Sequence, residues 1–472
     1  YIMASSVKVN TITTQSGSTL TVGESGKTIS LASGATATGF GRTGAVDWQT
    51  TKKTGDFTAA TTEGYFVDTS SAAITATLPS SPSAGAIVGF KDYTGTFATY
   101  NLTIARNGSN IQGNANDSKI ITNRASVIMV YVDSTEGWVF TVESNVADLQ
   151  DKEYVTASGG TITTSGDYKI HTFTGAGTFT VSAAGNAAGS NTVDYMVVAG
   201  GGGGGGSTSP GGGGGGGGGG GWRASSGTAS GSYTAGPGPL TSPVSALSVS
   251  AQGYPITIGA GGTGAVGAGP GPSPVVATQG GSSVFSTITS AGGGLGGHPN
   301  SPAQAGGNGG SGGGSSWETR TGGTGNTPPV SPPQGNDGGN GTSAPTYQGG
   351  PGGGAVGAGT DLPAPSGNQG QSGGVGAVSH ITGSPVGYAG GGGGGGTNSP
   401  GNGDQGGGAS PDGSGGAGGP ATPSAGPGRY GSDGATNRGG GAGGGASGPA
   451  PDNSNGGVGG SGVVVIRYKY QN

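Results

Sequence analysis

Two unbroken glycine runs, Gly200–Gly206 and Gly211–Gly221, constrain this chain more than any other feature of its sequence. Glycine loses more conformational freedom on folding than any other residue, so such runs form either a flexible spacer or an unusual ordered structure. The ordered form open to them is the polyproline II conformation, which makes no internal hydrogen bonds and would give these runs lengths of about 22 Å and 34 Å. Each buried N–H and C=O must then pair with another segment, and runs without Cβ atoms can approach closely enough to do this. The runs therefore predict a polyglycine II helix bundle.

An internal repeat supports the same structure. The segment AGGGGGGGSTSP at residues 199–210 recurs as AGGGGGGGTNSP at residues 389–400, which favours rods of equal length that turn at one end of a bundle. An apolar strand, Val193–Val198, leads into the first run, and another, Val463–Tyr470, leaves the last glycine-rich segment. We therefore predict a C-terminal β collar that brackets the bundle. A low-complexity spacer between the two strands is the alternative.

The rest of the chain predicts short strands, and residues 44–147 show no helical period. Pairs of alternating apolar residues near the N-terminus, such as Val7 and Val9, indicate strands too short to be stable without neighbours, and copies of the same chain are the simplest neighbours. Alternation at Ile74, Ala76 and Leu78, with recurrent turn signals, is typical of a small β-sandwich-like domain. The predicted fold class is all-β, with short intertwined N-terminal strands. The predicted regions are an N-terminal β-arm (1–43), a β-domain (44–147), a linker (148–153) and a glycine-rich domain (154–472).

Charge and reactive residues argue against several function classes. The net charge is −5, only 8% of residues are charged and no basic cluster occurs, so we expect no nucleic-acid partner. The sequence has no stretch of 18 or more apolar residues, so we expect no membrane insertion. The segment GESGKT resembles the end of a phosphate-binding loop, but Thr21 stands where that motif needs glycine. With no cysteine, three scattered histidines and no nucleophile motif, we expect no enzyme activity, no cofactor and no metal. His171 alternates within a predicted strand and is expected to face solvent or a polar seam.

Aromatic residues inside the glycine-rich zone are the candidate binding residues. A polyglycine lattice has no room for a large ring, so these side chains should gather at the ends or edges of the bundle. Exposed aromatic residues among flexible polar ones are typical of recognition loops. The alternative is that they cap rods or seal the axis of a trimer, and Trp222, directly after the longest run, fits that role better. The candidate receptor contacts are Trp317, Tyr347, Tyr388, Tyr430 and Tyr233.

Several segments resemble, in the same order, the glycine-rich domains of bacteriophage tail fibres. They are YKIHTFTGAGTFTVS, DYMVVAGGGGGGG, YPITIGAGGTGAVG, GGSSVFSTITSAGGGLGG and GGSGVVVIRYKY. Segments before residue 150, such as ASSVKVNTITTQSGSTLTVGESGKTISL, are similar to tail fibres of marine phages. The resemblance implies a homotrimeric fibre of the virion tail, made in the host cytoplasm. Its N-terminal region would attach to a virion tail or adaptor protein.

The same resemblance implies what the distal part does. Its loops would bind a host surface receptor, either a glycan or an outer-membrane protein, and thus act as an adhesin. Because such loops vary within the family, the resemblance assigns no receptor residues. The alternative function is that of a glycine-rich structural protein of a bacterial surface or extracellular matrix, which an export signal or a repeat array would favour. Neither feature is evident in the sequence.

Overall fold

A computed structural model describes residues 46–143 and, with gaps, residues 152–471 of the chain. Contacts divide the chain into two compact units, residues 1–151 and 152–472, which we call the N-terminal unit and the glycine-rich unit. The predicted β-arm region, 1–43, and most of the predicted linker lie outside the described residues. The gaps in the glycine-rich unit are residues 208–211, 242–243, 268–274, 300–304, 318–319, 344–345, 361–370, 398–405, 422–428 and 449–453.

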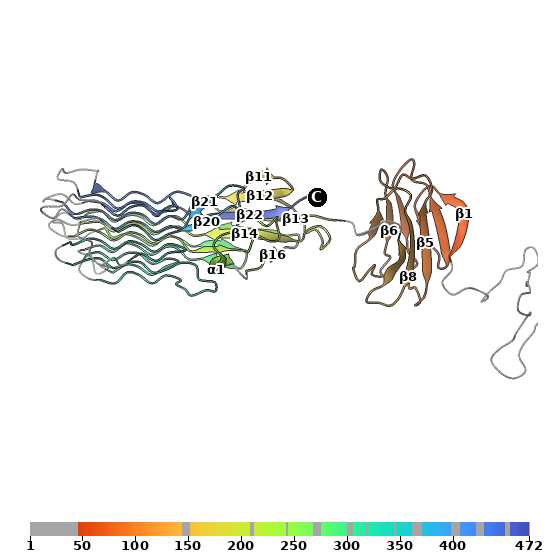
Figure 1. Cartoon of the computed structure of the whole chain (residues 1–472), viewed down its shortest axis with the longest axis horizontal. Helices are drawn as coiled ribbons and strands as arrows, with labels where there is room; N and C mark the ends of the chain where they lie inside the picture. The colour runs from red at the N-terminus through yellow and green to blue at the C-terminus, as the bar shows by residue number, and fades with distance from the viewer. Residues whose placement is uncertain are drawn as a thin grey trace, which may run out of the picture. The chain divides into compact units, whose positions relative to one another are not determined.

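The described residues are mostly β, which confirms the coarse fold class (Figure 1). The one α-helix among them is a single turn, α1 (Gly238–Thr241). The strands of the N-terminal unit are β1 (Asp47–Lys53), β2 (Phe57–Thr58), β3 (Glu63–Val67), β4 (Ile74–Thr77), β5 (Ile87–Asp92), β6 (Leu102–Ala105), β7 (Ser118–Ile120), β8 (Ser126–Tyr131) and β9 (Trp138–Glu143). Those of the glycine-rich unit are β10 (Thr156–Ser158), β11 (Thr161–Ser165), β12 (Tyr168–Phe173), β13 (Gly177–Ala183), β14 (Thr192–Val198), β15 (Trp222–Ala224), β16 (Leu247–Ser248), β17 (Gly253–Thr257), β18 (Ser283–Phe285), β19 (Ile288–Ser290), β20 (Ala377–Ser379), β21 (Val386–Tyr388) and β22 (Val463–Lys469).

The N-terminal unit encloses one apolar core between two sheets, with orders β1-β3-β5-β8-β9 and β2-β4-β6-β7. From β1 to β6, successive strands alternate between the two sheets and pair in parallel within each, so the chain winds around the core. Strands β7 to β9 then pair antiparallel. The predicted alternation holds within β4 and just beyond it, because Ile74, Ala76 and Leu78 are buried while Thr75 and Thr77 are half-buried.

The glycine-rich unit is organised around β14 and β22, which pair antiparallel from Asp194↔Arg467 to Val198↔Val463. The first and last strands that flank the glycine runs are therefore direct neighbours, in the sheet β11-β12-β22-β14-β15. One face of this sheet packs on a second sheet, β10-β13-β17-β18-β19, around Phe179 and Phe285. The other face packs around Trp222 and Tyr388. Because both faces are covered, β22 begins with a continuous apolar run, Val463 to Ile466, instead of an alternating one.

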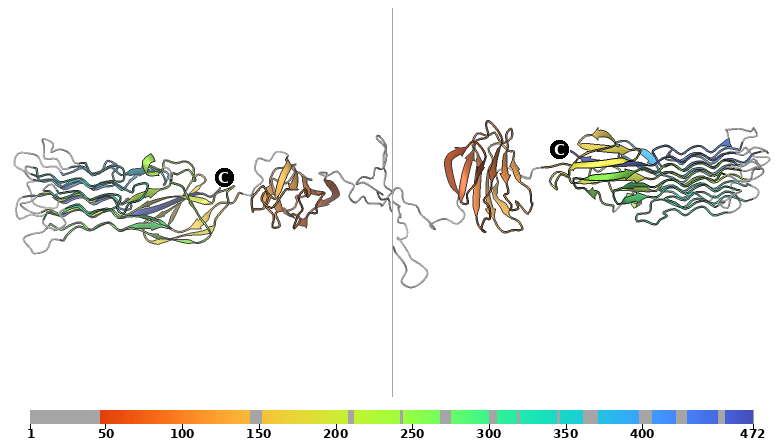
Figure 2. Two further views of the ribbon diagram at one scale, coloured as in Figure 1. Left: turned by 90° about the horizontal axis from the view of Figure 1, so that it is seen from below. Right: turned by 180° about the vertical axis from the view of Figure 1, so that it is seen from behind.

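The glycine-rich segments leave these sheets side by side and return to them, as two views of the unit show (Figures 1 and 2). We call the sheet side of each segment its sheet end and the opposite side its loop end. Segment 212–221 illustrates the orientation. Its sheet end continues into Trp222 of β15, and its loop end begins at Gly212.

The expectation that His171 faces solvent or a polar seam is wrong. This residue of β12 is completely buried, because its side of the sheet faces the core around Phe179. The ring stacks on Tyr468, and its Nε2 lies 3.0 Å from the Tyr468 hydroxyl. Nδ1 lies 2.7 Å from the carbonyl oxygen of Gly159. These contacts fit a neutral ring that donates from Nδ1 to the carbonyl and accepts at Nε2.

The stability of the glycine-rich unit is expected to fall as the pH is lowered from 7 to 5. Burial is the main cause that lowers the pKa of His171 below its ordinary value of 6.5, and the charge of Lys169 adds to it. The folded state therefore keeps the ring neutral, while the unfolded chain takes up a proton near pH 6.5, so stability present above that pH is lost below it. Calorimetry at pH 7, 6 and 5 measures this, and His171→Gln should make the pH dependence shallower. A melting temperature that rises as the pH falls would contradict a buried, neutral His171 ring in the folded state.

Candidate recognition surface

Hydrogen bonds from the longest glycine run follow a period of three residues. Every third N–H of this run donates to the same neighbouring segment, at N···O distances of 2.7–3.0 Å. In the first series, the N–H groups of Gly213, Gly216 and Gly219 donate to Tyr347, Gly350 and Gly353, respectively. In the second, those of Gly214, Gly217 and Gly220 donate to Gly445, Ala442 and Gly439. In the third, those of Gly215, Gly218 and Gly221 donate to Gly297, Gly294 and Ala291. The run thus presents its donors in three directions around its axis.

The carbonyl groups of the same run accept from three further segments. Gly202 and Gly205 donate to Gly218 and Gly215, at 2.9 and 2.8 Å. From a second segment, the N–H groups of Ser311 and Gly314 donate to the carbonyls of Gly219 and Gly216, respectively. From a third, those of Gly392 and Gly395 donate to the carbonyls of Gly217 and Gly214. Segment 212–221 is therefore surrounded by six others, and every N–H from Gly213 to Gly221 is bonded to backbone without any side chain.

This packing requires glycine along the run. A Cβ added at any position from Gly213 to Gly220 would lie 2.0–2.3 Å from a backbone oxygen of a neighbouring segment. None of these glycines has a positive φ, so the requirement comes from close approach and not from backbone conformation. The interior of this part of the unit is consequently uniform backbone, and chemical variety is confined to its surface and ends.

Three of the candidate aromatic residues lie at the loop end. The backbone N–H of Trp317 donates to the carbonyl of Gly213, and the Gly213 N–H donates to the carbonyl of Tyr347. The two rings meet edge to face with centroids 5.2 Å apart, and Tyr347 is 38% exposed. Tyr430, 41% exposed, follows Arg429, whose carbonyl accepts from Ala446 near the loop end of another segment. Trp317 and Tyr347 form a pair, which sequence spacing alone did not indicate.

The other two candidates lie at the sheet end. Tyr388 is buried in the core around Trp222, and Tyr233 packs against the same core with the Arg467 guanidinium 5.0 Å from its ring centroid. Burial raises the pKa of the Tyr388 hydroxyl, and Arg438 opposes this shift. Both rings are part of the packing between the sheet and the glycine segments. The structure therefore does not bring the five candidates together in one place.

Buried polar residues at the loop end were not indicated by the sequence. His298, near the loop end of its segment, is 1% exposed, and its Cδ2 would lie 3.2 Å from a Cβ added at Gly206. Burial lowers the pKa of His298. Arg429 is 2% exposed and lies close to Gly448. Side chains of this size at the margin of a glycine lattice fill space that the backbone leaves open.

Two kinds of feature are missing from the part of the chain that the structure describes. No helix there has the length and apolar character needed to cross a membrane. Nor do three or more histidine and acidic side chains gather there as metal ligands.

Residues 172–469 match the sequence profile of a family described as a glycine-rich domain. The match begins at the end of β12 and covers the strands from β13 to β22 and all the segments between them, which is more than half of the chain. The chain therefore belongs to this family of glycine-rich domains. No curated protein matches the chain.

Proposed function

We propose that this chain is the adhesin of a bacteriophage tail fibre, which binds a host surface receptor through the loop end of its glycine-rich unit. The observation that carries the proposal is the separation of roles within this unit. Its interior is hydrogen-bonded backbone that cannot distinguish one receptor from another, whereas Trp317, Tyr347 and Tyr430 concentrate large side chains at one end. Such rings are the residues that dominate binding energy in recognition surfaces.

The glycine segments would form a polyglycine II bundle in this proposal. The threefold period of the hydrogen bonds, the absence of positive φ angles in the run and the close approach of backbones all support that conformation. Such a bundle is rigid, so the loop-end residues are held in place before the receptor arrives. This lowers the entropy cost of binding.

The fibre would be a homotrimer attached to the virion tail, or to an adaptor protein, by its N-terminal region. Support for this comes from the resemblance to tail fibres described above. The receptor would be a glycan or an outer-membrane protein. Three loop ends on each fibre, and several fibres on each virion, would multiply weak single contacts through effective concentration.

Replacing Trp317, Tyr347 and Tyr430 together by alanine is expected to lower adsorption of purified fibres to host cells at least tenfold. A small number of interface residues carries most of the binding energy, and multivalency amplifies the loss of each contact. Fluorescently labelled fibres and host cells measure adsorption, and thermal unfolding shows that the variant folds. Tyr100→Ala is the matched control, because this tyrosine is equally exposed but belongs to the N-terminal unit.

Unchanged adsorption of the triple variant would place recognition elsewhere. Immunogold labelling provides a second test of the proposed class. Labelling of uninfected cell envelopes in place of phage tails would favour a bacterial surface or matrix protein.

A further inference from the structure

The outer face of the sheet β1-β3-β5-β8-β9 carries a row of aromatic rings that lie outside the apolar core. The partners Trp48, Gly64 and Gly89 lie side by side on β1, β3 and β5. A Cβ on Gly64 would lie 2.8 Å from the indole of Trp48, and one on Gly89 would lie 3.4 Å from it. The indole thus covers two buried glycines, and it can lie close to the sheet because neither has a side chain.

Two more rings continue the row. The Phe66 ring centroid is 5.2 Å from that of Trp48, and the Tyr93 centroid is 6.5 Å from that of Phe66. Trp48 and Phe66 are half-buried, whereas Tyr93 is 51% exposed. We call Trp48, Phe66 and Tyr93 the aromatic row.

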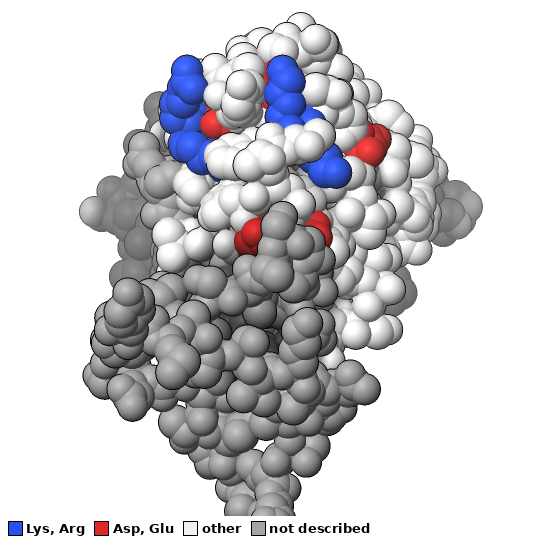
Figure 3. Space-filling model, turned by 90° about the vertical axis from the view of Figure 1, so that its right-hand side faces the viewer, with Lys and Arg blue, Asp and Glu red and all other residues white. Residues whose placement is uncertain are grey.

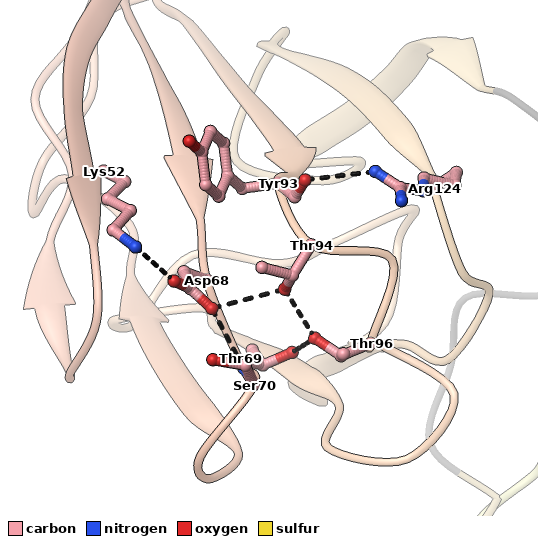
Figure 4. A network of polar contacts seen from close by, with 8 residues as sticks. All are labelled: Lys52, Asp68, Thr69, Ser70, Tyr93, Thr94, Thr96 and Arg124. Carbon is pink, nitrogen blue, oxygen red and sulfur yellow. Dashed lines mark hydrogen bonds and ion pairs between the residues drawn. The ribbon is translucent and has the colours of Figure 1, made fainter.

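Charged and hydroxyl groups surround the Tyr93 end of this row. Tyr93 lies between Lys52 and Arg124 (Figure 4). The Lys52 ammonium is 5.2 Å from the Tyr93 ring centroid and donates a 2.6 Å hydrogen bond to Asp68. That ion pair is the main cause that lowers the pKa of the Asp68 carboxyl, which also accepts from Ser70 and Thr94. Asp68 is therefore satisfied within the fold.

The remaining charges favour an anionic ligand. Asp92 is buried, and its carboxylate accepts backbone N–H groups of its own loop and of Arg124. Lys91, opposite Phe66 on β5, donates to the carbonyl of Arg124, and the Arg124 guanidinium donates to the carbonyl of Tyr93. Both cations carry more N–H donors than these bonds use. On the face drawn in Figure 3, charged side chains are few. Lys and Arg gather at one end of it, with Asp or Glu atoms beside them.

We propose that the aromatic row and its basic margin bind an anionic oligosaccharide. A sugar ring has an apolar face of C–H groups that packs on an aromatic ring, and its polar groups point outward from the edge of the ring. Tyr93 and Trp48 offer such ring faces, and Arg124 offers a fork of donors suited to a carboxylate or a sulfate. The site belongs to the N-terminal unit, so it does not depend on the function proposed for the loop end.

Calorimetric titration of the full chain with a uronic acid oligosaccharide tests the proposal. A sulfated form of the same backbone and a neutral, carboxyl-reduced form are titrated alongside it. We expect the anionic forms to bind at least tenfold more tightly than the neutral one, and their relative affinity identifies the preferred anion. Tyr93→Ala and Lys52→Gln should each weaken binding about tenfold, a change of about 1.4 kcal/mol.

Lys53→Gln is the matched control. This lysine follows Lys52 on β1, but its ammonium lies over the rings of Phe57 and Tyr65, 5.4 Å from each centroid. Its loss should change the affinity less than twofold. Gly64→Ala gives a second variant. The added methyl would lie 2.5 Å from Val46 and 2.8 Å from the Trp48 indole, so it must displace both side chains and should weaken binding while Tyr93 is intact.

Three results would overturn the proposal. They are no binding of any of the three oligosaccharides at millimolar concentration, equal binding by the Tyr93→Ala and parent chains, and a smaller oligomer for Tyr93→Ala in light scattering. The last would show that copies of the chain cover this face. Adsorption through Trp317, Tyr347 and Tyr430 could still hold in each case, so the two proposals fail separately.

Discussion

Gly217→Ala is expected to destabilise the glycine-rich unit by about 3 kcal/mol or more and to lower its melting temperature by roughly 6 °C or more. The added Cβ would lie 2.1 Å from the carbonyl oxygen of Gly202. That oxygen is backbone in a segment fixed by its own hydrogen bonds, so it cannot move aside as a flexible side chain would. The shift would also disturb the bond from the Gly217 N–H to Ala442, which is 2.7 Å long.

Calorimetry measures the stability loss, and hydrogen exchange shows where it occurs. Amides of residues 213–221 should exchange slowly in the parent chain, because each donates to a neighbouring segment, and faster in the variant. Gly175→Ala is the control, since an added Cβ there meets nothing within 4 Å and the φ is not positive. It should leave the melting temperature unchanged. Exchange at unstructured rates in the parent chain would contradict an ordered bundle.

Much of this architecture could be predicted from local patterns. The apolar strands before and after the glycine segments predicted a collar, and β14 and β22 are indeed paired. Period-two alternation located the core residues Ile74, Ala76 and Leu78. The parallel winding of β1 to β6 was not predicted, because strand spacing does not distinguish hairpins from strands that alternate between two sheets.

The sorting of aromatic residues could be predicted only in part. Trp222, Tyr388 and Tyr347 all stand beside glycine-rich segments in the sequence, yet the first two are buried at the sheet end and the third is exposed at the loop end. The difference depends on which end of its segment each residue occupies, and thus on the direction of every segment between β14 and β22. No local pattern encodes that direction.

The hydrogen-bond partners were beyond sequence reasoning for a related reason. Gly214 donates to Gly445, more than 200 residues further along the chain, and both are surrounded by chemically identical neighbours. Register among identical residues is fixed by the strands and turns at the ends of the segments. We infer that buried polar groups at the sheet end help to fix this register.

One of these groups, Asp194 of β14, joins the sheet to the segment that follows β15. Its carboxylate is completely buried and accepts from the Ser225 hydroxyl at 2.7 Å, and from the Ser230 N–H and hydroxyl at 2.8 and 2.6 Å. Its partner across the ladder is Arg467, whose Nε donates to the Ser230 carbonyl at 3.0 Å. Burial lowers the pKa of the Arg467 guanidinium, and the charge of Asp194 opposes this shift.

Asp194→Ala is expected to destabilise the glycine-rich unit by about 3–5 kcal/mol, because it leaves three donors without their acceptor and removes a negative charge that favours the buried Arg467 cation. Asp194→Asn keeps the shape and one acceptor oxygen, so its loss should be smaller but still measurable. Thermal unfolding compares both variants with Asp167→Ala, whose carboxylate receives a single 3.4 Å bond from Gln471 at the surface and should change little. Since β14 leads directly into the first glycine segment, amides of residues 200–206 should also lose protection in Asp194→Ala. Equal stability of Asp194→Ala and Asp167→Ala would show that β14 and β22 are held without this network.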